Sequence, residues 1–324
     1  MFLIVIPIIR TRGRHHRRGS LRRAAAAALL CAPLVGVAAC GSDDAADARP
    51  TVVVTTPLLG AVVEDLVGEA ARVEVVMPNG VDPHDFQPSA RDVEALADAE
   101  LVVENGLDLE EGLEDALGQA REDGVPVFTA TEHVSAREVA EGEEHEGEEE
   151  HAHSGEDPHI WMDPLAMRDV AVALAPVLEG DLGLDLAGRG AEVAAGLEAL
   201  DAEARETLAS VPEGRRKLVT GHESMGYFAD RYGFELVGAI IPSLSSQAQA
   251  SAEALAELRD AVRAAGVPVI FNEIGTPDGV ADAIAEETGA RVVEIGTHTL
   301  PDDGSYATFM REAAVAVAGG LASP

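Results

Sequence analysis

The chain has 324 residues, with 58 acidic against 23 basic side chains and a formal net charge of −35. Because 47% of the residues are apolar, this length is enough for one large or two medium domains with packed cores. Aromatic side chains make up only 3%, which argues against stacking platforms for bases or sugars. The negative charge excludes nucleic acid as a partner and favours cations.

Residues 1–39 have the pattern of an export signal. A basic stretch at 10–23 precedes a run of small apolar residues at 24–39, which is too short to span a bilayer. The sequence VAAC that ends in Cys40 resembles a bacterial lipobox, so we expect Cys40 to become the mature N-terminus and to receive a diacylglycerol. The pattern therefore predicts an extracytoplasmic protein anchored by lipid to the cell membrane, with 40–49 as a tether. The general and the twin-arginine export routes are both open.

From residue 51 onward, β-branched strand patterns alternate with helical patterns, which is typical of parallel sheets. In the first half of the chain, strands are expected at 51–56, 72–77, 100–106 and 125–130. Helices are expected at 57–68, at 89–99 with Ser89 as the cap, and near 109–121. An acidic, histidine-rich stretch at 138–157 has no apolar face and indicates a low-complexity loop.

Residues from about 164 to 209 have a helical pattern. One stripe of a long helix is formed by residues that recur at helical spacing, namely Val193, Leu197, Leu200, Ala204 and Leu208. Further strands are then expected at 217–221, 235–241, 267–273 and 291–296. They alternate with helices expected near 223–232, 248–265, 278–288 and from about 305.

These patterns predict an α/β fold with two parallel-sheet lobes joined by a long helix. The lobes are expected at 50–163 and 213–324, with the linking helical region at 164–212. Parallel strands present their C-terminal ends, and the loops after them, to the crevice beside the sheet. The cleft between the lobes is therefore the expected ligand site.

Four histidines lie in loops at or near the C-terminal ends of expected strands. They are His84, His159, His222 and His298, two from each half of the chain. Neutral imidazole is a good zinc ligand, and four nitrogen or oxygen ligands complete a closed tetrahedral site. The spacing matches no zinc-finger or HExxH pattern. The prediction of a shared site therefore rests on the arrangement of the two halves. The alternative is that the four are isolated surface histidines.

Several segments resemble the metal-binding receptors of zinc and manganese ABC transporters, the ZnuA-like or cluster A-I class. These segments are MPNGVDPHDFQPS, DPHIWMDP, VTGHESMGYFADRYGFELVG, FNEIGTPDGVADAIAEETGARVV and GSYATFM. The resemblance covers nearly all of residues 50–320. It implies two α/β lobes joined by a rigid long helix, with a metal site in the cleft between them.

The resemblance implies that the first three metal ligands are His84, His159 and His222. Manganese-type members usually have a glutamate at the third position, so a histidine there favours Zn²⁺ over Mn²⁺. The fourth family ligand is usually an aspartate, whereas His298 stands at the matching place in this chain. The alternatives for the fourth ligand are a water molecule, Asp302 and Asp303.

Further residues around these positions have weaker expected roles. The acidic stretch resembles the histidine-rich loop of zinc-type receptors, and three of its histidines are expected to collect metal ions near the cleft: His145, His151 and His153. A solvated charged linker is the alternative. Three acids flank the expected ligands and are candidates to orient imidazoles, namely Asp85, Asp163 and Glu223. His133 has no expected role.

We expect a monomeric receptor that captures zinc outside the membrane and delivers it to an ABC permease. A manganese-specific receptor of the same class and a zinc-buffering or adhesin lipoprotein are the alternatives. A zinc hydrolase is a distant alternative, because it would need an open coordination position and a general base. Glu223 beside His222 is the one candidate base, and the sequence contains no HExxH, GxSxG or Walker-type motif. We therefore expect no enzymatic activity.

Overall fold

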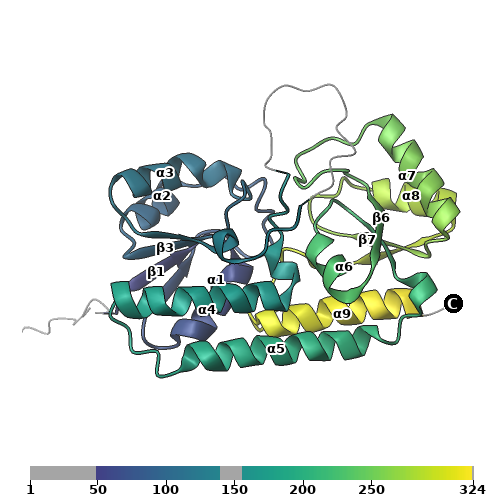
Figure 1. Ribbon diagram of the computed structural model, residues 1–324. Coiled ribbons are helices and arrows are strands. Elements are labelled where there is room, and N and C mark those ends of the chain that lie inside the picture. Colours follow the sequence, from purple (N-terminus) through teal and green to yellow (C-terminus); the bar gives the residue numbers. More distant parts are fainter. Residues whose placement is uncertain (1–48, 139–154, 323–324) are drawn as a thin grey trace, which may run out of the picture. The chain divides into compact units, whose positions relative to one another are not determined.

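A computed structural model describes residues 49–138 and 155–322 of the chain. In the first half, four parallel strands form one sheet in the order β2-β1-β3-β4 (Figure 1). The strands are β1 Thr51–Val54, β2 Arg72–Val75, β3 Leu101–Glu104 and β4 Val127–Thr129. The central strands β1 and β3 are almost wholly buried, which explains their unbroken β-branched and leucine character.

Three helices connect these strands and cover the sheet: α1 Pro57–Val67, α2 Ala90–Ala97 and α3 Glu114–Glu122. Pro57 occupies the first turn of α1, where its missing N–H costs no hydrogen bond. Ser89 caps α2 as predicted, because its hydroxyl accepts from the Asp92 N–H while the Asp92 carboxylate accepts from the Ser89 N–H. The cap sets the point at which the long loop after β2 ends.

The second half repeats the arrangement of strands seen in the first. The strands β5 Lys217–Thr220 and β6 Glu235–Ala239 form one parallel pair, and β7 Val269–Asn272 and β8 Arg291–Glu294 form another. Strand β5 also contacts β7, so the neighbours run β6, β5, β7, β8 in the same pattern as β2, β1, β3, β4. The helices of this half are α6 Gly226–Tyr232, α7 Ala252–Ala265 and α8 Val280–Thr288. The predicted α/β class with parallel sheets is confirmed.

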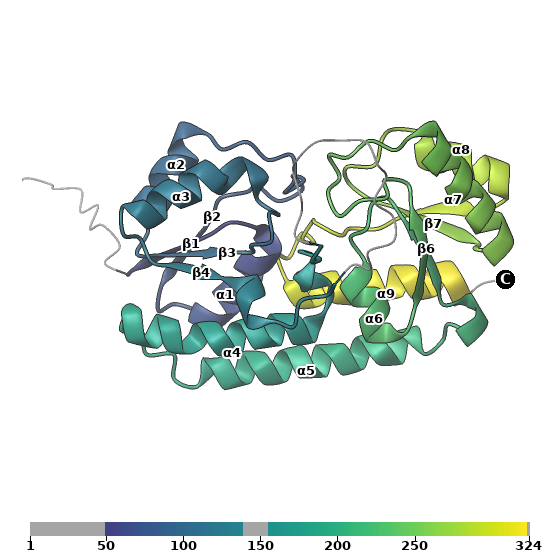
Figure 2. The ribbon, with the colours of Figure 1, turned by 45° about the horizontal axis from the view of Figure 1, so that its top comes forward.

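The central helical region contains two helices, α4 Pro164–Asp181 and α5 Arg189–Leu208. The helical pattern predicted from 164 to 209 is interrupted between them, where Gly183, Ala187 and Gly188 adopt positive φ angles. Helix α5 contacts α1, α4 and the last helix, α9 Tyr306–Ala322. In Figure 2, α4 lies along the left part of α5 and α9 along its right part.

The predicted apolar stripe of α5 faces the core. Leu197, Leu200, Ala204 and Leu208 are buried, and Val193 is partly buried. These side chains belong to one hydrophobic cluster that also contains residues of α1, α4, α6 and α9. Because interiors of this kind are close-packed, the cluster ties the helices beneath both sheets together.

Some sequence predictions fall outside the described residues. These are the export signal at 1–39, Cys40, and the histidines of the acidic stretch, His145, His151 and His153. Among the helices of residues 49–138 and 155–322, none is long and apolar enough to cross a membrane.

Candidate metal centre

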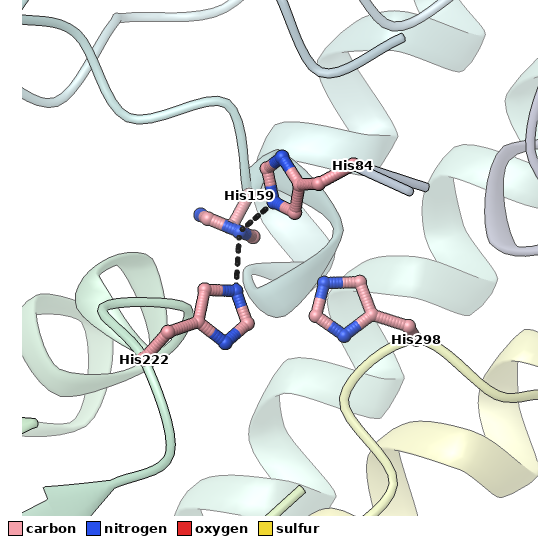
Figure 3. A group of neighbouring side chains, drawn as sticks. All are labelled: His84, His159, His222 and His298. Atoms are coloured by element: carbon pink, nitrogen blue, oxygen red, sulfur yellow. Dashed lines mark hydrogen bonds between the residues drawn. The ribbon is translucent and has the colours of Figure 1, made fainter. Parts of the chain in front are cut away.

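Four buried histidines meet at one point of the fold (Figure 3). His84 lies in the loop between β2 and α2, and His159 precedes a short 3₁₀ turn at Ile160–Met162. His222 follows β5, and His298 follows β8. None of the four residues is more than 4% exposed. Each offers a potential ligand atom, and these atoms all lie within 4.8 Å of one another.

The separations between ring nitrogens fit a shared tetrahedral ion. The Nε2 atom of His159 lies 3.4 Å from Nε2 of His84 and 3.2 Å from Nε2 of His222. A zinc ion with Zn–N bonds of about 2.0–2.1 Å holds tetrahedral ligand atoms about 3.3–3.4 Å apart. The rings of His222 and His298 are stacked, with centroids 5.2 Å apart. The residues therefore have the donor type and the spacing that a small divalent cation requires.

Two of the histidines share a local motif, Asp-Pro-His, at 82–84 and 157–159. In both, the aspartate Oδ1 accepts the backbone N–H of the histidine, at 3.1 Å in the first and 2.9 Å in the second. Asp157 Oδ1 also lies 2.7 Å from Nδ1 of His159. A proton on Nδ1 shared with Asp157 leaves the Nε2 lone pair directed at the cluster. The repeated tripeptide was a signal in the sequence, but sequence analysis did not single out Asp157.

One carboxylate, that of Glu273, orients both histidines of the second half. Its Oε1 accepts the His222 backbone N–H at 2.9 Å and lies 3.2 Å from Nδ1 of the same ring. Its Oε2 accepts from the hydroxyls of Ser224, at 2.7 Å, and Thr297. Thr297 Oγ1 in turn lies 2.9 Å from Nδ1 of His298. This chain leaves Nε2 of His298 buried, with no hydrogen-bond partner among the described residues and available to a cation.

Burial keeps two of the imidazoles in the neutral form that binds metal. Desolvation, followed by the charge of His222, lowers the pKa of His159 and of His298 well below the ordinary value. Burial acts most strongly to lower the pKa of His222, but the charge and hydrogen bond of Glu273, together with the charges of Asp82 and Asp157, outweigh it and raise the pKa. Burial acts to raise the pKa of Glu273, yet the charge of His222 and the hydrogen bonds that Glu273 accepts lower this pKa. Desolvation raises the pKa of Asp157 to about 6.

Other candidates from the sequence are exposed or make contacts of their own. Asp163 caps α4 by accepting the Leu165 N–H at 2.8 Å. Asp302 and Asp303 are exposed, and Asp303 accepts from the hydroxyl of Thr308. Asp85 is also exposed, the backbone N–H of Glu223 donates to Ser243, and His133 stacks on Phe128. Carboxylates that do lie against imidazoles are those of Asp157, at His159, and Glu273, at His222.

Residues 52–320 match the family described as zinc-uptake complex component A, periplasmic. The chain belongs to this family. It is 32% identical over 271 residues to the zinc-binding protein TroA of Treponema pallidum, covering 82% of this chain and 84% of that protein. It is 26% identical over 278 residues to the manganese-binding lipoprotein MntA of Halalkalibacterium halodurans, covering 83% and 88%. The solved structure of TroA covers 85% of this chain and 100% of its own, with a TM-score of 0.71 and 26% identity.

Membership of the zinc-uptake component A family confirms the general function predicted from the sequence. The chain is an extracytoplasmic metal-binding receptor that works as the substrate-binding component of an ABC transporter, and it is not an enzyme. The named metal differs between relatives, since TroA is zinc-binding and MntA is manganese-binding. The choice of metal therefore depends on the residues of this chain.

Proposed function

We propose that the protein captures one Zn²⁺ ion with His84, His159, His222 and His298. The observation that carries the proposal is that Nε2 of His159 lies 3.4 Å from Nε2 of His84 and 3.2 Å from Nε2 of His222, separations that match the edge of a zinc tetrahedron. Four imidazole nitrogens also favour zinc over manganese, because carboxylate and water oxygens suit manganese better. The bound ion is cargo, and a closed four-ligand site suits capture more than catalysis.

The second part of the proposal concerns delivery of the zinc ion. We propose that a lipid on Cys40 holds the monomeric receptor at the outer face of the cell membrane, where it passes its zinc ion to the permease. His145, His151 and His153 would collect metal ions near the cleft. The lipoprotein relatives MntA, AdcA and FimA support the lipid anchor.

Two variants of the receptor role remain as alternatives. In a manganese receptor, the same four side chains would bind Mn²⁺ more tightly than Zn²⁺. In a zinc-buffering or adhesin lipoprotein, binding would be unchanged but no permease would accept the ion. Competition between the two metals decides the first alternative, and zinc uptake by cells with and without the intact protein decides the second.

The direct test is a competition titration of the purified protein against a chromogenic chelator. We expect one zinc ion per chain in the wild type and strongly weakened binding in His159→Ala. His133→Ala is the matched control, because that imidazole stacks on Phe128 outside the cluster, and it should bind zinc like the wild type. Equal affinities in His159→Ala and in the wild type would contradict the assigned site.

A further inference from the structure

The four histidines are unequally attached to the two halves of the fold. His222 and His298 follow strands of the second half. The segment 157–163, which carries His159, precedes α4 and contacts both halves. Its Asp157 pairs with Arg137 of the first half, since the Asp157 N–H donates to Arg137 O at 2.9 Å and the two side chains lie 3.4 Å apart. Trp161 of the same segment contacts the second half. Trp161 Nε1 donates to Thr297 O at 2.7 Å, and the Tyr306 hydroxyl donates to Trp161 O at 2.8 Å.

Two further contacts attach the same segment to helix α6 of the second half. Arg231 lies 3.6 Å from the Asp163 carboxylate. Gly226 lies so close to Asp157 that a Cβ atom there would stand 2.3 Å from Oδ2 of the aspartate. Toward the first half, Asn105 Nδ2 donates to Pro158 O at 2.9 Å. Arg137, which pairs with Asp157, is itself held at 2.9 Å by the Asp230 carboxylate of α6. His159, His222 and His298 therefore form a three-histidine platform on one body.

His84 is held differently. Its loop, residues 78–85, leaves the first sheet after Met77, whose N–H donates to Thr55 O. The loop then reaches the second half through polar contacts at two points. Asn79 Nδ2 donates to Leu300 O at 2.9 Å, and the Leu300 N–H donates to Asn79 Oδ1 at 2.8 Å. The Asn79 side chain is thus paired with both backbone polar groups of Leu300, in the loop after β8.

The second point lies next to the metal centre. Ser246 Oγ donates to Asp82 Oδ2 at 2.6 Å, while Asp82 Oδ1 accepts the His84 N–H at 3.1 Å. Gly275, with a φ of 86°, leaves the space for this contact, since a Cβ atom there would lie 2.5 Å from Asp82 Oδ2. The carboxylate of Asp82 therefore joins Ser246 of the second half to the backbone of His84.

We propose that the loop 78–85 is a latch that sets how long the metal stays bound, with Asn79 and Ser246 as positioning residues. The two contacts hold His84 over the three-histidine platform, and release begins when the latch detaches and His84 leaves first. The ion then stays on three ligands with one open coordination position, where a ligand from the permease or from a chelator can bind. This inference rests on the proposed zinc site and adds the order in which its ligands dissociate from the ion.

The test is the rate at which zinc passes from the full-length protein to excess EDTA, followed by stopped flow. Asn79→Ala removes two hydrogen bonds from an exposed side chain and should speed dissociation about tenfold, with little change in association. Ser246→Ala removes one bond and should give a smaller acceleration. Arg259→Ala, which removes an exposed ion pair with Glu287 inside the second half, is the control and should dissociate at the wild-type rate.

A double-mutant cycle shows whether the latch acts through His84. In a His84→Ala background, which we expect to hold zinc on three ligands, Asn79→Ala should no longer change the dissociation rate. An equal acceleration in both backgrounds would overturn the latch, as would wild-type dissociation in Asn79→Ala or complete loss of zinc binding in His84→Ala. If the wild type itself binds no zinc, the proposed function fails, whereas a zinc-binding wild type with an unaffected Asn79→Ala variant refutes the latch alone.

Discussion

The two halves of the chain use the same order of parallel strands but present their histidines in different ways. In the second half, His222 follows β5 at once and His298 stands just after β8, and the carboxylate of Glu273 serves both. In the first half, His84 lies within a long loop between β2 and α2. The same topology thus provides one part of the site close to the strand ends and one part that depends on loop contacts across the fold.

The halves also differ in their buried glutamates. Glu273 lies among imidazoles, and their charge and hydrogen bonds lower its pKa. Glu110 lies beneath the loop after β3, where desolvation raises its pKa to about 7 even though Thr55, Asn105 and Gly106 donate to it. The comparison indicates that burial raises the pKa of a carboxyl, whereas neighbouring imidazoles lower it and keep the carboxylate anionic, as a cation site requires.

The largest expected effect is on zinc affinity, and it distinguishes a ligand of the three-histidine platform from the ligand on the latch, His84. His222→Ala removes a ligand from the three-histidine platform and should weaken zinc binding by more than the ~10–100-fold typical of losing an outer-sphere partner. His84→Ala should weaken binding less, because the remaining ligands stay on one body. Isothermal titration with a competing chelator measures both. Equal losses in the two variants would remove the distinction between the halves.

The next effect concerns stability and Glu110. The pKa of Glu110 is about 7 in the folded protein and 4.5 for an ordinary glutamate, so the unfolded chain loses this proton first as the pH rises. Its contribution to stability is therefore full below pH 4.5 and is lost by about pH 7, a change on the order of 3 kcal/mol. Relative to the wild type, Glu110→Gln should gain about this much unfolding free energy between pH 4.5 and 7.5.

Urea unfolding of the zinc-free protein at the two pH values measures this shift. Comparing the variant with the wild type at each pH cancels the titration of all other groups. A difference between variant and wild type that does not vary with pH would mean that Glu110 titrates as in the unfolded chain.

A smaller effect is expected from the carboxylates that orient the rings. Glu273→Gln should lower zinc affinity about 10–100-fold, because His222 loses its anionic partner and Thr297, which lies against His298, loses its anionic acceptor. Asp157→Asn affects His159 alone and should lie at the lower end of that range. Competition titration at pH 7.5 ranks the two variants, and an Asp157→Asn loss greater than that of Glu273→Gln would contradict the larger role assigned to Glu273.

The smallest effect is expected from the acidic stretch. Deleting residues 141–153 removes His145, His151 and His153, and should leave the equilibrium affinity for zinc almost unchanged. Loading from dilute zinc should become slower if these residues collect ions. Abolished equilibrium binding after the deletion would place the main site in the stretch itself.

Much of the fold was predictable from local patterns. The eight strands lie where runs such as TVVV and VIFN predicted them, and Ser89 caps α2 as expected. The break between α4 and α5 was missed, because it depends on positive φ angles at Gly183, Ala187 and Gly188, and the apolar pattern continues across it.

The site was predictable in part. The four histidines were named from their places after strands and from the family resemblance. Glu273 was not, since it lies far from His222 in the sequence and reaches it only because β5 and β7 are neighbours. The attachment of His159 to the second half depends on contacts of Trp161 and Tyr306 that no periodicity indicates.

The most direct test of the central claim is a crystal structure of the zinc-loaded protein, with anomalous data collected on both sides of the zinc edge. We predict a single strong peak bonded to one nitrogen each of His84, His159, His222 and His298, at about 2.0–2.1 Å. A zinc ion bound instead by Asp302 or Asp303 in place of His298, or an ion outside this cluster, would contradict the account.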